Sequence, residues 1–124
     1  MEHLSKTAAC KRYGIPTYET RIVYSDYFDR VDIFYHSTAI ATIWGSGKVR
    51  IDNGGWWSKT TKKRINAILS ALGLPYGIYQ ASWQWYLSDR EGITYPLKNE
   101  TNYNGYHFTA YFDTNTKVLL PQGD

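Results

Sequence analysis

The sequence predicts an α+β fold: a mostly antiparallel sheet with one main amphipathic helix, at about residues 59–72, packed on one face. Segments on both sides of this helix alternate apolar and polar residues with the period of two that half-buried strands show. Within the helix, apolar residues recur every three or four positions and form a single stripe. Strands, one helix and more strands are typical of a helix packed on one sheet face.

The part of the chain before the helix is predicted to be mainly strand. A short helix is expected around residues 4–10, and Gly14 and Pro16 interrupt the chain after it. Later, a Gly-Ser-Gly turn joins two β-rich segments, as expected of a half-buried antiparallel hairpin. The strands are predicted at residues 20–25, 31–36, 38–44 and 48–52.

The helix has recognisable signals at both ends. Ser58 or Thr60 can cap its first turn, while Gly73 and Pro75 end it. Its apolar stripe consists of Ile65, Ile68, Leu69 and Leu72. Turn residues then separate further short strand-like segments, at 76–80, 83–87, 92–97, 106–112 and 117–120.

Length and composition indicate one domain, residues 1–124, with its own core. Aromatic residues make up 17% of the chain, with 12 Tyr and 5 Trp, so some rings must lie at the surface. Trp83 and Trp85 share one face, which fits either a core pair or an exposed stacking platform. The single Cys10 excludes a disulfide within a monomer. No segment resembles a signal peptide or a membrane span, so we expect a cytoplasmic protein.

The positive charge is concentrated in one part of the chain. The net charge is +3, yet residues 48–64 hold six basic residues against Asp52, a local balance of +5 that leaves −2 for the rest. The basic residues are Lys48, Arg50, Lys59, Lys62, Lys63 and Arg64. Such a cluster is either a solvated helix face or an anion-binding surface.

The segment DNGGWWSKTTKKR, residues 52–64, permits both interpretations. Helix N-termini favour acidic residues because the helix dipole is positive there, but this one has cations and no acid in its first turn. If Ser58 is the N-cap, Thr61 occupies the position where a capping box has Glu or Gln. Lys62 likewise occupies the position where an aliphatic residue would pack against Trp57.

Glycines, free N–H groups and hydroxyls beside cations are what a phosphate requires, and a tryptophan adds a surface for base stacking. Lys48 and Arg50, on the polar face of the preceding strand, can extend the same patch. We therefore predict an anion or nucleic-acid site made of Lys48, Arg50, Gly54, Gly55, Trp56, Trp57, Ser58, Lys59, Thr60, Thr61, Lys62, Lys63 and Arg64.

Other chemical motifs are weak. WGSGK at 44–48 lacks the first glycine and the final Ser or Thr of a Walker loop. Asp26, Asp29 and Asp32 have no His or Cys beside them to complete a metal site. The three histidines lie far apart in the sequence, and none accompanies a recognisable nucleophile. We therefore expect a protein that is not an enzyme and has no metal or cofactor.

About half of the chain resembles small proteins encoded in tailed-phage genomes. The resemblance is carried by YHSTAIATI at 35–43, KVRIDNGGWWSKTTKKRINAIL at 48–69 and the aromatic segment WQWYL at 83–87. It implies a phage or prophage origin and carries no activity or functional residue. Small phage proteins of this kind often prove to be anti-defence inhibitors, including anti-CRISPR proteins.

The resulting hypothesis is a phage-type binding protein in the host cytoplasm. It would inhibit a host defence system by binding nucleic acid, or a nucleoprotein complex that contains it, through the basic start of the helix. One alternative is a sponge that holds a signalling nucleotide at the same residues. Another is an inhibitor that binds a host protein through its Tyr- and Trp-rich strands. The sequence does not decide the oligomeric state.

Overall fold

The computed structural model describes residues 1–82, 84–96, 100–102 and 105–121, and it confirms an α+β fold dominated by antiparallel sheet. In chain order the elements are α1 (Lys6–Tyr13), β1 (Thr20–Ser25), β2 (Arg30–Tyr35), β3 (Thr38–Trp44), β4 (Lys48–Asp52), α2 (Lys59–Ala71), β5 (Tyr76–Ala81), β6 (Gln84–Asp89), β7 (Thr94–Pro96), β8 (Glu100–Asn102), β9 (Gly105–His107), β10 (Thr109–Asp113) and β11 (Val118–Leu119).

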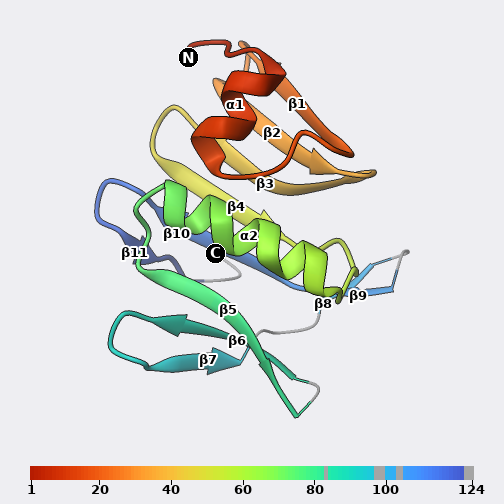
Figure 1. The fold of residues 1–124 in the computed structure, drawn as a ribbon. Coiled ribbons are helices and arrows are strands. Elements are labelled where there is room, and N and C mark those ends of the chain that lie inside the picture. The colour runs from red at the N-terminus through yellow and green to blue at the C-terminus, as the bar shows by residue number, and fades with distance from the viewer. Residues whose placement is uncertain (83, 97–99, 103–104, 122–124) are drawn as a thin grey trace.

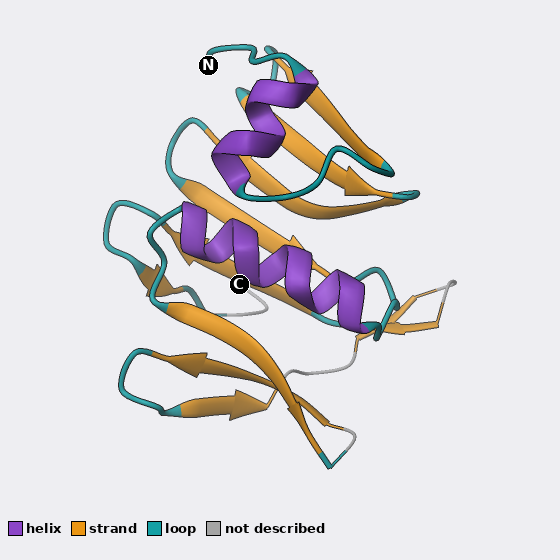
Figure 2. Ribbon diagram, viewed as in Figure 1, coloured by secondary structure: helices purple, strands orange, loops and turns teal. Residues whose placement is uncertain are grey.

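The strands of the described residues form three sheets (Figure 1). The largest has the order β1-β2-β3-β4-β10-β11, a second has the order β5-β6-β7, and β8 pairs with β9. Strand β10 pairs with β4, so the C-terminal part of the chain completes a sheet that the N-terminal half begins. Helix α1 contacts β1 and α2, and α2 contacts β3 and β5. Both helices lie on the same face of the six-stranded sheet (Figure 2).

The alternation along β4 assigns its side chains to two faces. Val49 and Ile51 are fully buried, and Ile51 pairs in register with Ala41 and Ala110, which are buried as well. This apolar face lies against α2, whose buried residues include Ile65, Ile68 and Leu69. Residues at alternate positions of a strand point to opposite faces. Lys48, Arg50 and Asp52 therefore lie on the outer face, away from the helices.

Both helices begin at a serine cap. The Ser58 Oγ accepts a hydrogen bond of 3.2 Å from the Thr61 N–H, and α2 ends at Ala71, one residue before the predicted end. The Ser5 Oγ accepts a bond of 3.2 Å from the Ala8 N–H, and α1 extends further than predicted, to Tyr13. The glycine after α1 adopts φ +69°, a left-handed conformation that suits the residue after a helix.

The two adjacent tryptophans before α2 have opposite environments. Trp57 packs edge-to-face against the buried Trp85, with ring centroids 5.1 Å apart, and both contact Phe108. Trp56 is 56% exposed. Of the pair that the sequence left undecided, Trp85 belongs to the core and Trp83 lies outside the described residues.

The predicted strand at residues 106–112 is divided in the structure. Its first part belongs to β9 and its second to β10, in different sheets. Phe108 lies between them and is fully buried, and its N–H donates to the Asn53 Oδ1 at 3.0 Å. The Phe108 amide thus bonds to a side chain and not to a neighbouring strand. The alternation of apolar and polar residues does not reveal this break in the strand.

Asn66 joins α2 to the three-stranded sheet. Its Nδ2 donates to the Ile78 carbonyl at 2.9 Å, and its Oδ1 accepts from the Ile78 N–H at 2.6 Å. The half-buried amide therefore bonds β5 as a neighbouring strand would.

We expect Asn66→Asp to lower the free energy of unfolding by about 1 to 3 kcal/mol, because a carboxylate oxygen would face the Ile78 carbonyl without a proton between them. The control is Asn115→Asp, which loses a similar bond from Asn115 Nδ2 to the Ser46 carbonyl at an exposed site and should change stability by less than about 0.5 kcal/mol. Urea denaturation measures both values, and equal losses would contradict the proposed role of Asn66.

Candidate functional site

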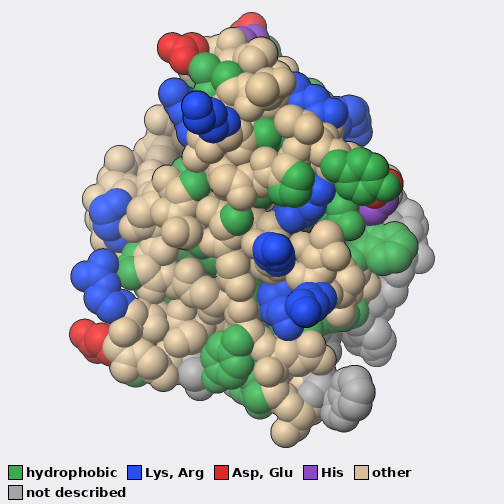
Figure 3. Space-filling model, viewed as in Figure 1, with side chains coloured by type: hydrophobic (Ala, Val, Ile, Leu, Met, Phe, Trp, Pro, Cys, Tyr) green, Lys and Arg blue, Asp and Glu red, His purple; other side chains and the backbone are tan. Residues whose placement is uncertain are grey.

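The two helices form a layer of a single charge sign. We call α1 and α2 together the helical layer; α1 contributes three Lys or Arg residues and α2 four, and neither contains Asp or Glu. The rest of the chain holds the other seven basic residues against all 11 acidic ones, a balance of −4. Figure 3 shows Lys and Arg side chains across this face of the molecule, with the visible Asp and Glu side chains near its margins.

No ion pair neutralises the helical layer within the described part of the chain. The ion pairs there connect acidic residues with the N-terminus, His3, Arg30, His36, Arg50 and His107. None of these groups lies on α1 or α2. The positive charge of the helices is thus left for solvent ions or an external anion.

A groove lies beside the N-terminal half of α2. We call it the entrance groove; its volume is about 410 Å³. Lys59 and Lys63 are exposed, and Tyr18, on the connection between α1 and β1, is 72% exposed. The groove is lined by Gly14, Ile15, Pro16, Tyr18, Lys59, Thr60, Lys63, Arg64 and Ala67. Among the predicted site residues, Lys59, Thr60, Lys63 and Arg64 are therefore brought together.

Arg64 is only 4% exposed and forms an inner wall of the groove. Its Nη1 donates to the Thr20 Oγ1 at 2.5 Å, its Nη2 donates to the Tyr18 carbonyl at 2.6 Å, and its guanidinium lies 4.1 Å from the Tyr35 ring centroid. This corrects the prediction of a direct anion contact, because Arg64 uses these donors to hold the segment before β1. Its charge still lies within the groove wall.

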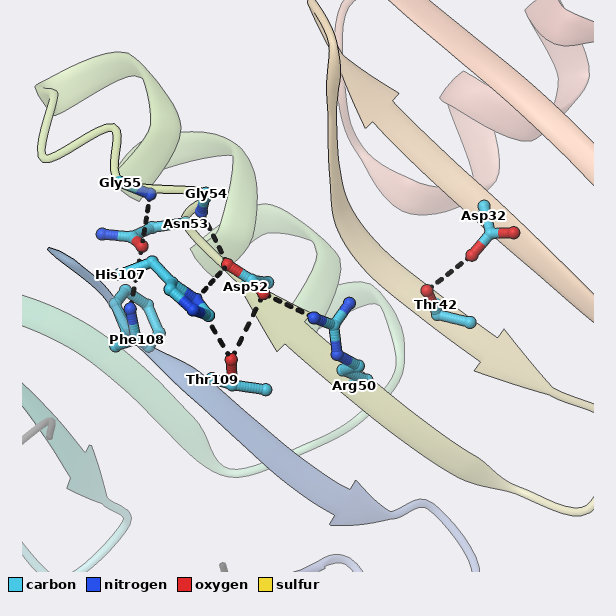
Figure 4. Close-up of polar contacts among 10 residues, drawn as sticks. All are labelled: Asp32, Thr42, Arg50, Asp52, Asn53, Gly54, Gly55, His107, Phe108 and Thr109. Atoms are coloured by element: carbon cyan, nitrogen blue, oxygen red, sulfur yellow. Dashed lines mark hydrogen bonds and ion pairs between the residues drawn. The ribbon is translucent and has the colours of Figure 1, made fainter. Parts of the chain in front are cut away.

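The amides of Gly54 and Gly55 have partners within the chain. The Gly54 N–H donates to the Asp52 Oδ1 at 2.6 Å, and the Gly55 N–H donates to the Asn53 Oδ1 at 3.0 Å (Figure 4). Of the free N–H groups that a phosphate site requires, these two glycines therefore supply none. Asp and Asn side chains often bond an amide two residues later, and here they do so in succession.

Asp52 is the centre of a buried polar network. Its side chain is 8% exposed, and its Oδ2 accepts from Arg50 Nη2 at 2.5 Å and from Thr109 Oγ1 at 3.2 Å. Its Oδ1 lies 3.2 Å from His107 Nδ1 in addition to the Gly54 N–H. Four donors on the strand, the turn and the C-terminal segment therefore surround one carboxylate (Figure 4).

The remaining residues at the start of α2 have structural roles. Ser58 caps the helix and its hydroxyl also donates to Thr61 Oγ1 at 2.9 Å, and Thr61 is fully buried. Trp57 packs in the aromatic cluster. Lys62 Nζ lies 3.5 Å from Gln80 Oε1 and 5.5 Å from the Trp85 ring centroid, so this lysine covers the cluster.

Lys48 and Arg50 do not extend the lysine patch of α2, contrary to the prediction. They lie on the outer face of β4, because Val49 and Ile51 take the face toward the helices. Lys48 Nζ is 4.9 Å from the Tyr111 ring centroid and 5.5 Å from that of Trp44. Arg50 lines a second cavity, of about 520 Å³, together with Gly54, Gly55 and Trp56. The predicted patch is thus divided between two sites.

Sequence reasoning missed Tyr18, Thr109 and the role of His107. Tyr18 reaches the groove through a hydrogen bond to Arg64, 46 residues away, and Thr109 lies 57 residues from Asp52. No local pattern signals such pairs.

Burial raises the pKa of the Cys10 thiol, which disfavours a thiolate nucleophile there. Among the described residues, no group of three or more His, Cys, Asp or Glu side chains could hold a metal ion.

The turn that begins with Asn53 and leads into α2 tolerates little at Gly54. This residue has φ +61°, and a Cβ there would lie 2.4 Å from Thr38 Cγ2. We expect Gly54→Ala to lower the free energy of unfolding by more than 2 kcal/mol, roughly, since backbone strain and overlap add. The control Gly92→Ala has similar strain, at φ +83°, but open space around the Cβ, and should cost about 1 kcal/mol. Equal costs in denaturant titrations would exclude the overlap with Thr38.

Comparison with known proteins places the chain in a phage family. No helix within the described ranges has the length and apolar character needed to cross a membrane. No curated protein and no solved structure matches the chain. A family model described as Kyanoviridae Gp96 protein matches residues 1–117. The chain therefore belongs to the Kyanoviridae Gp96 protein family, a family of small tailed-phage proteins.

Proposed function

We propose that this phage protein binds nucleic acid, either free or within a host nucleoprotein complex, through the helical layer. One observation carries the proposal: two neighbouring helices hold seven basic residues and no acidic residue, while the rest of the chain is net negative. In this proposal the protein is a non-catalytic binder whose biological effect is to inhibit a host defence system.

A phosphate backbone suits this surface better than a compact ligand does. The exposed cations are distributed along both helices, from Lys6, Lys11 and Arg12 on α1 to Lys59 and Lys63 on α2. Lysine contacts to phosphate supply affinity without sequence choice, and binding releases the counterions condensed on the nucleic acid. The affinity should therefore fall steeply as the salt concentration rises.

The entrance groove strengthens this interpretation. Lys59 and Lys63 lie at the positive end of the α2 dipole, where an anion is stabilised and where neither helix provides a carboxylate. The exposed ring of Tyr18 adds an aromatic surface beside them. A signalling nucleotide would contact the same groups. Its affinity would then depend strongly on the residues that line the entrance groove and only weakly on lysines outside it.

A second candidate, inhibition of a host protein, is favoured by the turn between β1 and β2. Tyr27 is 90% exposed and Phe28 55% exposed, and their rings pack edge-to-face with centroids 4.8 Å apart. Exposed aromatic residues are enriched at protein interfaces. This interpretation predicts co-purification with a host protein that depends on Tyr27 and not on Lys59 or Lys63.

We expect the double variant Lys59→Gln/Lys63→Gln to bind a short DNA duplex roughly 10- to 100-fold more weakly at about 50 mM salt. The slope of log affinity against log salt concentration should decrease by about two, one for each phosphate contact that is lost. Fluorescence anisotropy with a labelled duplex across a salt series measures both quantities.

The matched control is Arg21→Gln/Lys48→Gln. Both residues are exposed on the outer face of the sheet, and each double variant removes two positive charges from a net charge of +3. The control should bind almost as the unaltered protein does. Equal losses from the two variants would show that only net charge matters and would overturn the assignment to the helical layer.

A further inference from the structure

We propose that the second cavity binds one nucleoside phosphate unit, with the base stacked on Trp56 and acceptor oxygens held by Arg50. We call this cavity the Arg50 pocket; it is lined by Ser37, Thr38, Ala39, Arg50, Asp52, Gly54, Gly55 and Trp56. The proposal names the part of a nucleic acid that the protein recognises. Where the ligand is a nucleic-acid strand, the proposal rests on the proposed function.

The pocket is a formed feature of the fold. It lies between the start of β3 and the turn that leads from β4 to α2, and its volume of about 520 Å³ is within the usual range for small-molecule sites. The wall is tightly closed at Gly54, whose backbone lies so near Thr38 that a Cβ would overlap it. A pocket of this volume can accommodate one nucleotide.

The chemistry of the wall favours a ligand that accepts hydrogen bonds. The carboxylate of Asp52 is already surrounded by the donors of Arg50, Gly54, His107 and Thr109, so it has little capacity to accept from a ligand. Arg50 has five N–H donors and is fixed by Asp52 through one of its nitrogens. Its other donors, with the hydroxyls of Ser37 and Thr38, suit phosphate or base carbonyl oxygens.

Trp56 supplies the apolar part of the site. More than half of its surface is exposed, in contrast to the neighbouring Trp57, which packs against Trp85. The exposed ring lines the same pocket as Arg50. Stacking on an aromatic ring requires an unpaired base, because a base within a duplex already has neighbours on both faces. The site is therefore specific for single-stranded nucleic acid or a free nucleotide.

The position of the pocket connects it with the helical layer. Trp56 precedes Lys59 by three residues, so their Cα atoms are at most about 11 Å apart. A strand whose phosphates contact Lys59 can thus place a neighbouring base on Trp56. The Arg50 pocket lies on the outer side of this connection and the entrance groove on the helical side.

The test compares a labelled oligothymidylate single strand with a DNA duplex at the same salt concentration. Trp56→Ala should weaken binding of the single strand about 5- to 150-fold, the effect of losing one base-aromatic stack, and leave duplex binding unchanged. Trp56→Phe keeps an aromatic face and should restore most of the affinity. Tyr27→Ala removes an aromatic residue of 90% exposure at the opposite end of β2 and serves as the matched control.

Competition with free thymidine monophosphate distinguishes the two sources of the ligand. Displacement of the strand at comparable concentrations would assign the pocket to a free nucleotide, and displacement only at far higher concentrations would assign it to a strand. Single-strand binding that does not depend on Trp56 would overturn the pocket and leave the helical layer in place.

If neither DNA binds the unaltered protein, the proposed function fails. Quenching of tryptophan fluorescence by thymidine monophosphate, lost in Trp56→Ala, would then still support the pocket, and its absence would overturn both.

Discussion

The buried carboxylate of Asp52 is the constraint on which the arrangement of both candidate sites depends. A carboxylate at 8% exposure is stable only when donors replace the water it has lost. Here the donors come from β4 itself, from the turn after it and from residues 55 and 57 positions away. One side chain therefore fixes the orientation of Arg50, holds the turn that starts α2 and joins the C-terminal strand to β4 (Figure 4). Asn53 extends this connection by binding the amides of Gly55 and Phe108.

The fixed turn separates two chemical environments. Before it, the period-two alternation of β4 directs Arg50 and Asp52 to the outer face of the sheet, while Val49 and Ile51 join the core. After it, α2 covers the opposite face and directs Lys59 and Lys63 to solvent. Trp56 stays outside and Trp57 turns inward, so the two adjacent tryptophans mark the boundary between the pocket and the core.

The fold class, the hairpin of β3 and β4 and the limits of α2 follow from local sequence patterns, because apolar periodicity and capping residues act over a few positions. The site was predicted only in part. Lys59, Thr60 and Lys63 do line one groove. Lys48 and Arg50 do not, because they lie on the outer face of β4. The amides of Gly54 and Gly55 donate to the side chains of the two preceding residues. The sequence alone does not show whether such amides bond to the chain itself or to an external anion. Tyr18 and Thr109 enter their sites through tertiary contacts over 46 and 57 residues, for which one sequence has no local signal.

The charge of the helical layer is a consequence of placement and not of a shortage of acidic residues. The chain has 11 of them, and within its described part several are bonded to groups outside the two helices, as Glu19 is to His36 and Asp26 to His3. Each lysine near the start of α2 is opposed by the helix dipole, at a cost of a few tenths of a kcal/mol, and the cations also repel one another. An acidic residue in the first turn would remove this strain, yet the cap of α2 is completed by the hydroxyls of Ser58 and Thr61 instead.

An arriving phosphate would relieve the same strain, so part of the free energy of binding would come from repulsion already present in the unbound protein. That contribution depends on surface charge and is screened by salt, whereas stacking on Trp56 is not, and the salt dependence of binding therefore separates the two contributions.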